Sequence, residues 1–135
     1  MAVFDTKTGL PMALAPDSSD TAALTVVCFC AAWCDTCGLF RASFERIAES
    51  RPRQTFVWLD IEDDSAICGD IDVENFPTLA VYRGERLLHY GVSLPQEGTV
   101  ARLIDELATR DTASPDAPKP VLDLPRAIAS AAAGE

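Results

Sequence analysis

Two cysteines separated by two residues, Cys34 and Cys37, stand between a strand pattern and a helix pattern. The preceding run, residues 23–30, is apolar and rich in β-branched residues, which is typical of a strand buried on both faces. Over residues 34–50, apolar side chains recur at helical spacing and charged ones occupy the other side. The pair therefore lies at a predicted helix start, about one turn apart, which is close enough for a disulfide.

This position favours a reactive thiol at Cys34. Unpaired backbone N–H groups and the helix dipole stabilise negative charge at a helix N-terminus. We interpret Cys34 as the nucleophile of dithiol–disulfide exchange and Cys37, inside the helix, as the thiol that resolves the mixed disulfide. The alternatives are a structural or metal-binding pair and an inert pair. We expect no metal and no cofactor, because no second CxxC or Cys/His pair stands at ligand spacing and His89 is the only histidine.

The segment from Ala31 to Cys37 resembles the active-site segment of thioredoxins, and residues 75–78 resemble the cis-proline loop of that family. The resemblance covers roughly residues 22–110. It implies an α/β, thioredoxin-like fold in which a mixed central sheet of four to five strands is sandwiched by helices.

The resemblance also implies a substrate-binding surface. Trp33 would give the substrate an apolar flank, and a cis Pro77 would let the backbone of Phe76 bond an extended substrate segment. The competing interpretations are a core tryptophan and an ordinary trans proline that opens an edge strand.

Four residues depart from the family pattern. Asp35 and Thr36 replace the usual Gly-Pro between the cysteines, and an acid beside Cys34 disfavours its thiolate, which makes the dithiol a better reductant. Cys28 and Trp58 stand where the family has a buried aspartate and its lysine partner. Without that carboxylate we expect slow turnover, unless water or Asp60 substitutes for it.

The remaining cysteines are read first as buried, small apolar residues. Cys28 and Cys30 share one strand face and cannot pair comfortably with each other. Cys30, close to the active-site segment, and Cys68, before the Pro77 loop and expected to face the site, are candidates for an extra redox thiol. A redox sensor in which either exchanges with the CxxC pair is therefore a third hypothesis.

Composition excludes several function classes. A net charge of −10 argues against binding to nucleic acid or to an anionic membrane. No apolar run is long enough to span a bilayer, and the N-terminus lacks the pattern of a secretory signal. The odd count of five cysteines fits a reducing cytosol, so we expect a cytoplasmic protein. We also expect a monomer.

The chain divides into three parts. Residues 1–22 contain an expected edge strand and a loop, residues 23–110 form the thioredoxin-like domain, and residues 111–135 are a Pro/Ala-rich tail that we expect to be disordered or loosely docked. Further elements are predicted as strands at 55–61 and 79–82, a strand after the turn at 83–85, a short helix at 66–71, and a last helix at 94–109 that starts with a Ser93–Gln96 capping box.

The sequence thus predicts a thiol–disulfide oxidoreductase that reduces protein disulfides through Cys34 and Cys37. The expected partners are disulfide-containing client proteins and an electron donor, either a thioredoxin-reductase-like enzyme or a small thiol. The alternative is a binding or chaperone-like adaptor that has the same fold and weak or no redox turnover.

Overall fold

The computed structural model describes most of the predicted domain and the C-terminal segment. The described residues are 3–5, 24–31, 34–51, 53–69, 71, 73, 77–83, 86–93, 95–109 and 117–134, with the side chains of 129 and 131–134 left out. The predictions for Trp33, for Phe76 and for the loop within residues 1–22 lie outside the described residues.

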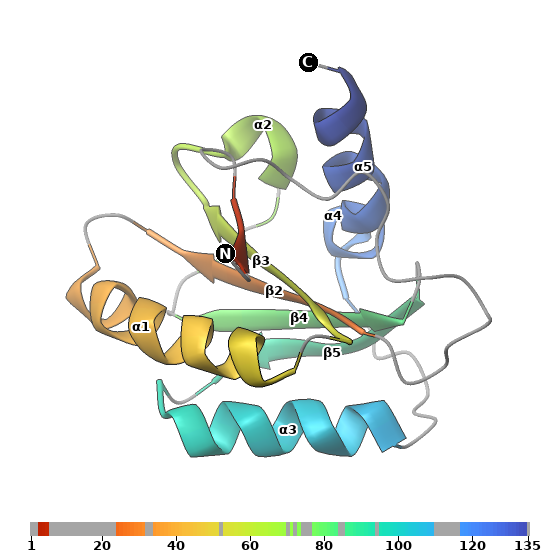
Figure 1. Cartoon of the computed structure of the whole chain (residues 1–135). Helices are drawn as coiled ribbons and strands as arrows, with labels where there is room; N and C mark the ends of the chain where they lie inside the picture. The colour runs from red at the N-terminus through yellow and green to blue at the C-terminus, as the bar shows by residue number, and fades with distance from the viewer. Residues whose placement is uncertain are drawn as a thin grey trace.

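Five strands form one mixed sheet in the order β1-β3-β2-β4-β5, seen across the middle of Figure 1. The strands are β1 (Val3–Phe4), β2 (Thr25–Cys30), β3 (Thr55–Asp60), β4 (Thr78–Arg83) and β5 (Arg86–Val92). β1 and β2 each pair with β3 in parallel, and β4 runs antiparallel to both β2 and β5. The predicted mixed sheet is confirmed, and β1 is the edge strand expected near the N-terminus.

Helices cover both faces of this sheet (Figure 1). α1 (Asp35–Ser50) and α3 (Glu97–Thr109) lie on one face. The other face carries α2 (Ser65–Cys68), α4 (Lys119–Leu122) and α5 (Leu124–Gly134). Within the described part of the chain, no helix combines the length and the apolar character that crossing a membrane requires.

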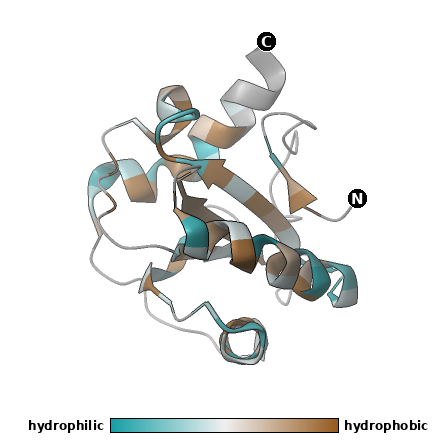
Figure 2. Ribbon diagram, turned by 90° about the vertical axis from the view of Figure 1, so that its left-hand side faces the viewer, coloured by the Kyte–Doolittle hydropathy of each residue, from teal (hydrophilic) through white to brown (hydrophobic). Residues whose placement is uncertain are grey.

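β2 is the centre of the core, because all six of its residues are buried. Its side chains alternate between two apolar clusters, with Val26, Cys28 and Cys30 facing α1 and α3, and Val27 and Phe29 facing the opposite layer. We call these clusters the α1/α3 layer and the α2/α5 layer. Figure 2 shows hydrophobic residues along the strands of the sheet, and hydrophobic and hydrophilic residues alternating along the helices.

Two helices differ from their predicted bounds. α3 begins at Glu97, three residues after the predicted start. The Ser93 N–H donates to the carbonyl oxygen of Pro77 at 3.0 Å, so it is not paired with the Gln96 side chain as the predicted capping box requires. The first intrahelical bond comes from Val100 N–H to the carbonyl oxygen of Gln96. α2 ends at Cys68 rather than at residue 71, since Gly69 adopts a φ of 58°.

The C-terminal segment is more ordered than the loosely docked tail expected from its composition. Val121, Leu124 and Ile128 are fully buried in the α2/α5 layer, at spacings of three and four residues that place them on one helical face. The Tyr82 hydroxyl donates to the carbonyl oxygen of Val121 at 2.6 Å and joins α4 to β4. The tail therefore completes the core instead of lying beside it.

This packing predicts that Leu124→Ala lowers the free energy of unfolding by about 2–5 kcal/mol, because the change leaves a cavity in a closed apolar layer. Urea denaturation followed by circular dichroism measures the effect. Leu122, which is 41% exposed, supplies the matched control, and Leu122→Ala should cost under about 0.5 kcal/mol. Equal, small losses for both variants would mean that the tail does not belong to the core.

Candidate active site

Cys34 lies at the N-cap of α1 with a free, partly exposed thiol. Its backbone is fixed on both sides, since its N–H donates to the carbonyl oxygen of Ala31 at 3.0 Å and its own carbonyl accepts the N–H of Gly38 at 3.2 Å. Asp35 and Thr36, the first two residues of the helix, are exposed. Cys34 is thus held where backbone N–H groups converge, as the sequence predicts.

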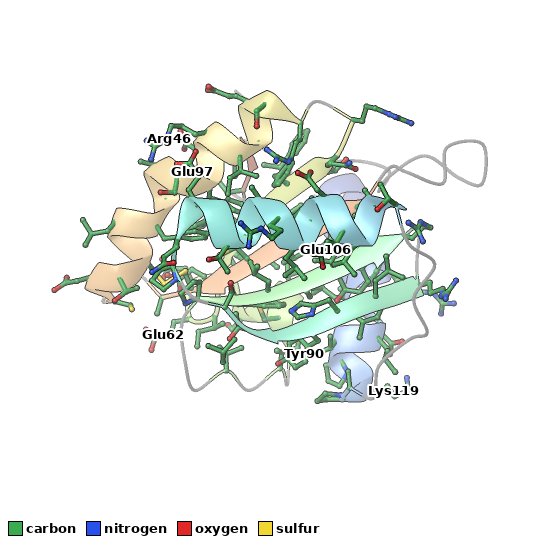
Figure 3. The ribbon with its side chains drawn as sticks, turned by 90° about the horizontal axis from the view of Figure 1, so that it is seen from below. Arg46, Glu62, Tyr90, Glu97, Glu106 and Lys119 are labelled. Carbon is green, nitrogen blue, oxygen red and sulfur yellow. A yellow bond between two sulfur atoms is a disulfide. The ribbon has the colours of Figure 1, made fainter. Side chains whose placement is uncertain are left out.

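Cys37 is bonded to Cys30 in this structure and not to Cys34. The Cα atoms of Cys30 and Cys37 are 5.8 Å apart, and both side chains are almost fully buried. Figure 3 draws the bond in yellow beside the first turn of α1. The expected 34–37 disulfide is therefore replaced by one that ties the end of β2 to the start of α1.

The two bonded cysteines meet because each faces the α1/α3 layer. Cys30 is the last residue of β2 and points to the same side as Cys28, whose sulfur lies 3.8 Å from that of Cys30. Cys37 lies on the inner stripe of α1, in register with Phe40 and Phe44. The strand and the helix thus bring three sulfur atoms into one apolar layer.

An ion pair joins the two helices on the exterior of the α1/α3 layer. Arg46 of α1 and Glu97 of α3, which face each other in Figure 3, lie 2.8 Å apart.

Cys28 and Trp58, which stand where the resemblance implies a buried acid–lysine pair, are neighbours in the sheet. The strand register places Trp58 directly beside Cys28. Burial raises the pKa of the Cys28 thiol far above its usual range, with the positive charge of Arg41 opposing the shift. Cys28 thus keeps its proton and does not take over the role of a carboxylate base.

Arg41 is the site residue that sequence reasoning missed. Its guanidinium carbon lies 5.0 Å from the centroid of the Trp58 ring, and the group also pairs with Asp5 at 3.2 Å and Glu45 at 2.8 Å. The amphipathic pattern places Arg41 on the polar side of the helix. In the sequence, the only indication of a positive charge at this place is indirect. Trp58 stands where the resemblance implies a lysine, so a charge from another residue can replace it.

Asp60, considered as a substitute base, is engaged elsewhere. One of its carboxylate oxygens accepts the backbone N–H groups of Glu62 and Asp63, at 2.8 and 2.9 Å, and so caps the turn after β3. Asp60 pairs with Cys30 in the register of the sheet, so it lies at the same end of the sheet as the active-site cysteines. Its carboxylate nevertheless bonds the turn after β3.

Cys68 belongs to the other side of the sheet. It is buried in the α2/α5 layer, whereas Cys30 and Cys37 lie in the α1/α3 layer, so the expectation that it faces the active site is wrong. Burial, together with the carboxylates of Asp64 and Asp60, raises the pKa of its thiol to about 12.

Pro77 lies at the same end of the sheet as the cysteines. It is buried and directly precedes β4, whose first residue, Thr78, pairs with Phe29 of β2. Because β2 and β4 are antiparallel, Pro77 falls opposite the end of β2, beside Cys30. The topology therefore brings the Pro77 segment and the CxxC segment together. Among the described residues, no group of three or more His, Cys, Asp or Glu side chains is placed to hold a metal ion.

A family comparison agrees with this geometry. The sequence matches the thioredoxin family model over residues 17–106, which include the cysteines, the sheet from β2 to β5 and most of α3. The chain belongs to the thioredoxin family. This result confirms the resemblance and the fold class that the sequence predicts.

The relatives within this family are distant. The chain is 30% identical to a thioredoxin of Ophiophagus hannah over 66 residues, which cover 49% of this chain and 63% of that protein. It is 24% identical to an H-type thioredoxin of Ricinus communis over 94 residues, or 70% and 80% of the two chains. A match to sulfhydryl oxidase 1 of Rattus norvegicus, at 31% identity, covers 67% of this chain and 14% of that protein. The chain thus spans less than two thirds of the Ophiophagus hannah protein.

Solved structures give the same fold. The oxidised thioredoxin of Plasmodium falciparum superposes with a TM-score of 0.55 at 21% identity, over 64% of this chain and 82% of that one. Deadhead, a germline-specific thioredoxin of Drosophila melanogaster, has a TM-score of 0.57 at 20% identity, over 66% and 83% of the two chains. At these identities the likeness shows the fold alone.

The burial of the thiols predicts selective alkylation. With Cys30 and Cys37 bonded, iodoacetamide should modify Cys34 alone in the folded protein, and Cys28 and Cys68 only in denaturant. At pH 8 a thiol with a pKa near 12 is thiolate in only about 1 molecule in 10⁴. Mass spectrometry of the adducts checks the result.

The same thiol predicts a pH effect on stability. Because the pKa of Cys68 is about 12 in the folded chain and about 8.5 when unfolded, its contribution to stability is complete below pH 8.5 and is lost progressively above it. Cys68→Ala should flatten the fall in unfolding free energy between pH 8.5 and 10, measured by urea denaturation. Rapid modification of Cys68 in the native protein at pH 8 would contradict both expectations.

Proposed function

We propose that the protein is a thiol–disulfide oxidoreductase that reduces disulfides of other proteins, with Cys34 as the nucleophile and Cys37 as the resolving thiol. The observation that carries the proposal is the free, partly exposed thiol of Cys34 at the N-cap of α1, with the disulfide-forming Cys37 one turn behind it. Membership of the thioredoxin family supports the same chemistry.

The proposed reaction has two exchanges. The Cys34 thiolate attacks one sulfur of a client disulfide, the client bond breaks, and the second client sulfur leaves as a thiolate. Cys37 then attacks the sulfur of Cys34, which forms the Cys34–Cys37 disulfide and releases the first client sulfur. The client gains two electrons and two protons, which an external dithiol or two small thiols must return to the protein.

The proposed substrate surface surrounds this nucleophile. Pro77 lies at the same end of the sheet as the cysteines, and the backbone of Phe76 would bond an extended client segment beside it, as in the family resemblance. Leu39, in the first turns of α1, is 80% exposed and adds apolar surface to this helix. Trp33 is proposed as the apolar flank, and Asp35 and Thr36 as residues that modulate the dithiol.

The resolving step is proposed to be slow. Cys28 and Trp58 occupy the place of a proton-accepting carboxylate and its lysine, and such a base commonly contributes about 10²-fold or more to a proton transfer. The expected partners are disulfide-containing clients and a thioredoxin-reductase-like or small-thiol donor. The free thiols at Cys28 and Cys68 are compatible with a reducing compartment such as the cytosol, and we propose a monomer there.

A binding or chaperone-like adaptor is the second candidate function. The observation that favours it is again the missing base beside Cys28, because a protein that holds clients does not need rapid turnover. The two functions differ in whether client capture depends on the sulfur of Cys34.

Substitution of the nucleophile tests the proposal. Cys34→Ser should lower the rate of insulin disulfide reduction by roughly 10³-fold or more, because no other exposed thiol starts the exchange. Cys37→Ser should instead accumulate a mixed disulfide between Cys34 and insulin, visible on a non-reducing gel. The matched control is Cys68→Ala, a buried thiol in the opposite layer, which should stay within about twofold of the parent rate. Full activity in Cys34→Ser would leave the adaptor as the better explanation.

A further inference from the structure

Cys37 has two cysteine neighbours in this structure, one bonded to it and one free. On one side it is bonded to Cys30 at the end of β2. On the other side Cys34 precedes it by one helical turn, packs against the same α1/α3 layer, and carries a free thiol. A single sulfur atom of Cys37 serves both neighbours, so the two disulfides exclude each other.

We propose that Cys30 is a third catalytic thiol. By internal exchange it replaces Cys34 as the disulfide partner of Cys37, so that Cys34 carries a free thiol while the protein is oxidised. The inference rests on the proposed function, because the Cys34–Cys37 disulfide is its starting point. The sulfur of Cys30 attacks the sulfur of Cys37 as Cys30 loses its proton, the Cys30–Cys37 bond forms and the Cys34–Cys37 bond breaks. Cys34 leaves as a thiolate and receives the proton that Cys30 gave up. No electron enters or leaves, so the step needs no further oxidant.

Differences in burial among the three cysteines decide which of them an external thiol can reach. Cys30 and Cys37 are only 1% and 2% exposed, whereas Cys34 is partly exposed. An external thiol therefore cannot attack the Cys30–Cys37 bond directly. Reduction passes through Cys34, which attacks the sulfur of Cys37 and returns the disulfide to the surface pair. The disulfide of the oxidised protein, Cys30–Cys37, thus lies buried in the core.

A second consequence concerns clients. Cys34 of the oxidised protein is a free thiol and still attacks a client disulfide, but Cys37 is then bonded to Cys30 and unable to resolve the product. The mixed disulfide on Cys34 persists until an external thiol cleaves it, because the inner bond is reduced only through a free Cys34. Oxidation therefore turns a reductase into a protein that holds its client.

Cys28 serves as the matched control for Cys30. Both thiols lie on the same face of β2 and are equally buried, and their sulfur atoms are 3.8 Å apart. Side chains two residues apart on a strand leave the sheet in parallel, with Cβ atoms about 6.6 Å apart, whereas a disulfide needs about 3.8 Å. Cys28 therefore lies beside the exchanging cysteines but cannot form a disulfide with Cys30.

Disulfide mapping tests the proposal on the full chain. The protein is oxidised in dithiothreitol redox buffer, whose cyclic oxidised form leaves no stable mixed disulfide, then quenched in acid and alkylated. Chymotryptic cleavage after Trp33 separates Cys30 from Cys34 and Cys37. A 30–37 bond then links two peptides, whereas a 34–37 bond lies within one. We expect the linked peptides in the parent protein and in Cys28→Ala, and the internal bond in Cys30→Ala, with Cys30→Ser as the second variant if Cys30→Ala does not fold.

The rate of reduction supplies a readout that a structural role for Cys30 would not change. We expect dithiothreitol to reduce the Cys30–Cys37 bond at least about tenfold more slowly in Cys34→Ser than in the parent protein, because the surface relay is absent. Equal rates, or an oxidised parent protein that contains only the 34–37 bond, would overturn the proposal. Insulin reduction that depends on Cys34 in the same preparations would show that the proposed function itself stands, so the two failures are distinguishable.

Discussion

The complete burial of β2 is the constraint on which the rest of this structure depends. A strand with no exposed residue must send alternate side chains into two separate apolar layers, so Cys28 and Cys30 go to one layer and Val27 and Phe29 to the other. The same alternation decides which thiols meet α1 when the chain turns back at Cys34. Cys68, in a helix on the opposite face, is separated from them by the sheet itself. The grouping of the cysteines therefore follows from strand geometry more than from their spacing in the sequence.

Among the described residues, no acid is buried in the layer that receives these thiols. Trp58 fills the volume next to Cys28, and Arg41 covers its ring from α1 and is held there by Asp5 and Glu45. A carboxylate in this position would need a partner, since an unpaired buried charge is very costly, whereas a thiol and an indole need none. The apolar replacement is thus physically consistent, with the loss of acid–base assistance as its consequence. The proposed sulfur exchange in this layer requires that the attacking thiol lose its proton and that the sulfur atoms lie close together, and the structure supplies the second condition.

Periodicity predicts most of the fold here and little of the site. The apolar run of β2 and the helical stripe of α1 follow from alternation and from 3.6-residue spacing, both of which are local. The start of α3 does not, because a bond from Ser93 to Pro77, residues far apart in sequence, overrides a good capping box. The sequence does not predict the docked tail, for a related reason. Its Ala- and Pro-rich composition resembles a linker, and only the burial of Val121, Leu124 and Ile128 distinguishes it. The CxxC motif predicts a reactive Cys34, but not which thiol Cys37 contacts, because strand twist and helix docking decide that.

Under the proposed exchange, the sulfur of Cys37 has two possible partners, Cys34 at the surface and Cys30 in the core. The two disulfides are therefore in equilibrium with each other. Exchange within the protein conserves the number of S–S bonds, so its equilibrium depends on local differences in burial and packing between the two arrangements. The core arrangement places both sulfur atoms in an apolar layer and leaves the partly exposed Cys34 thiol in contact with water. The surface arrangement leaves the thiol of Cys30 buried in that layer instead. Both differences favour the bond to Cys30, and under the proposed exchange the free thiol of Cys34 follows from this preference of Cys37 for the strand.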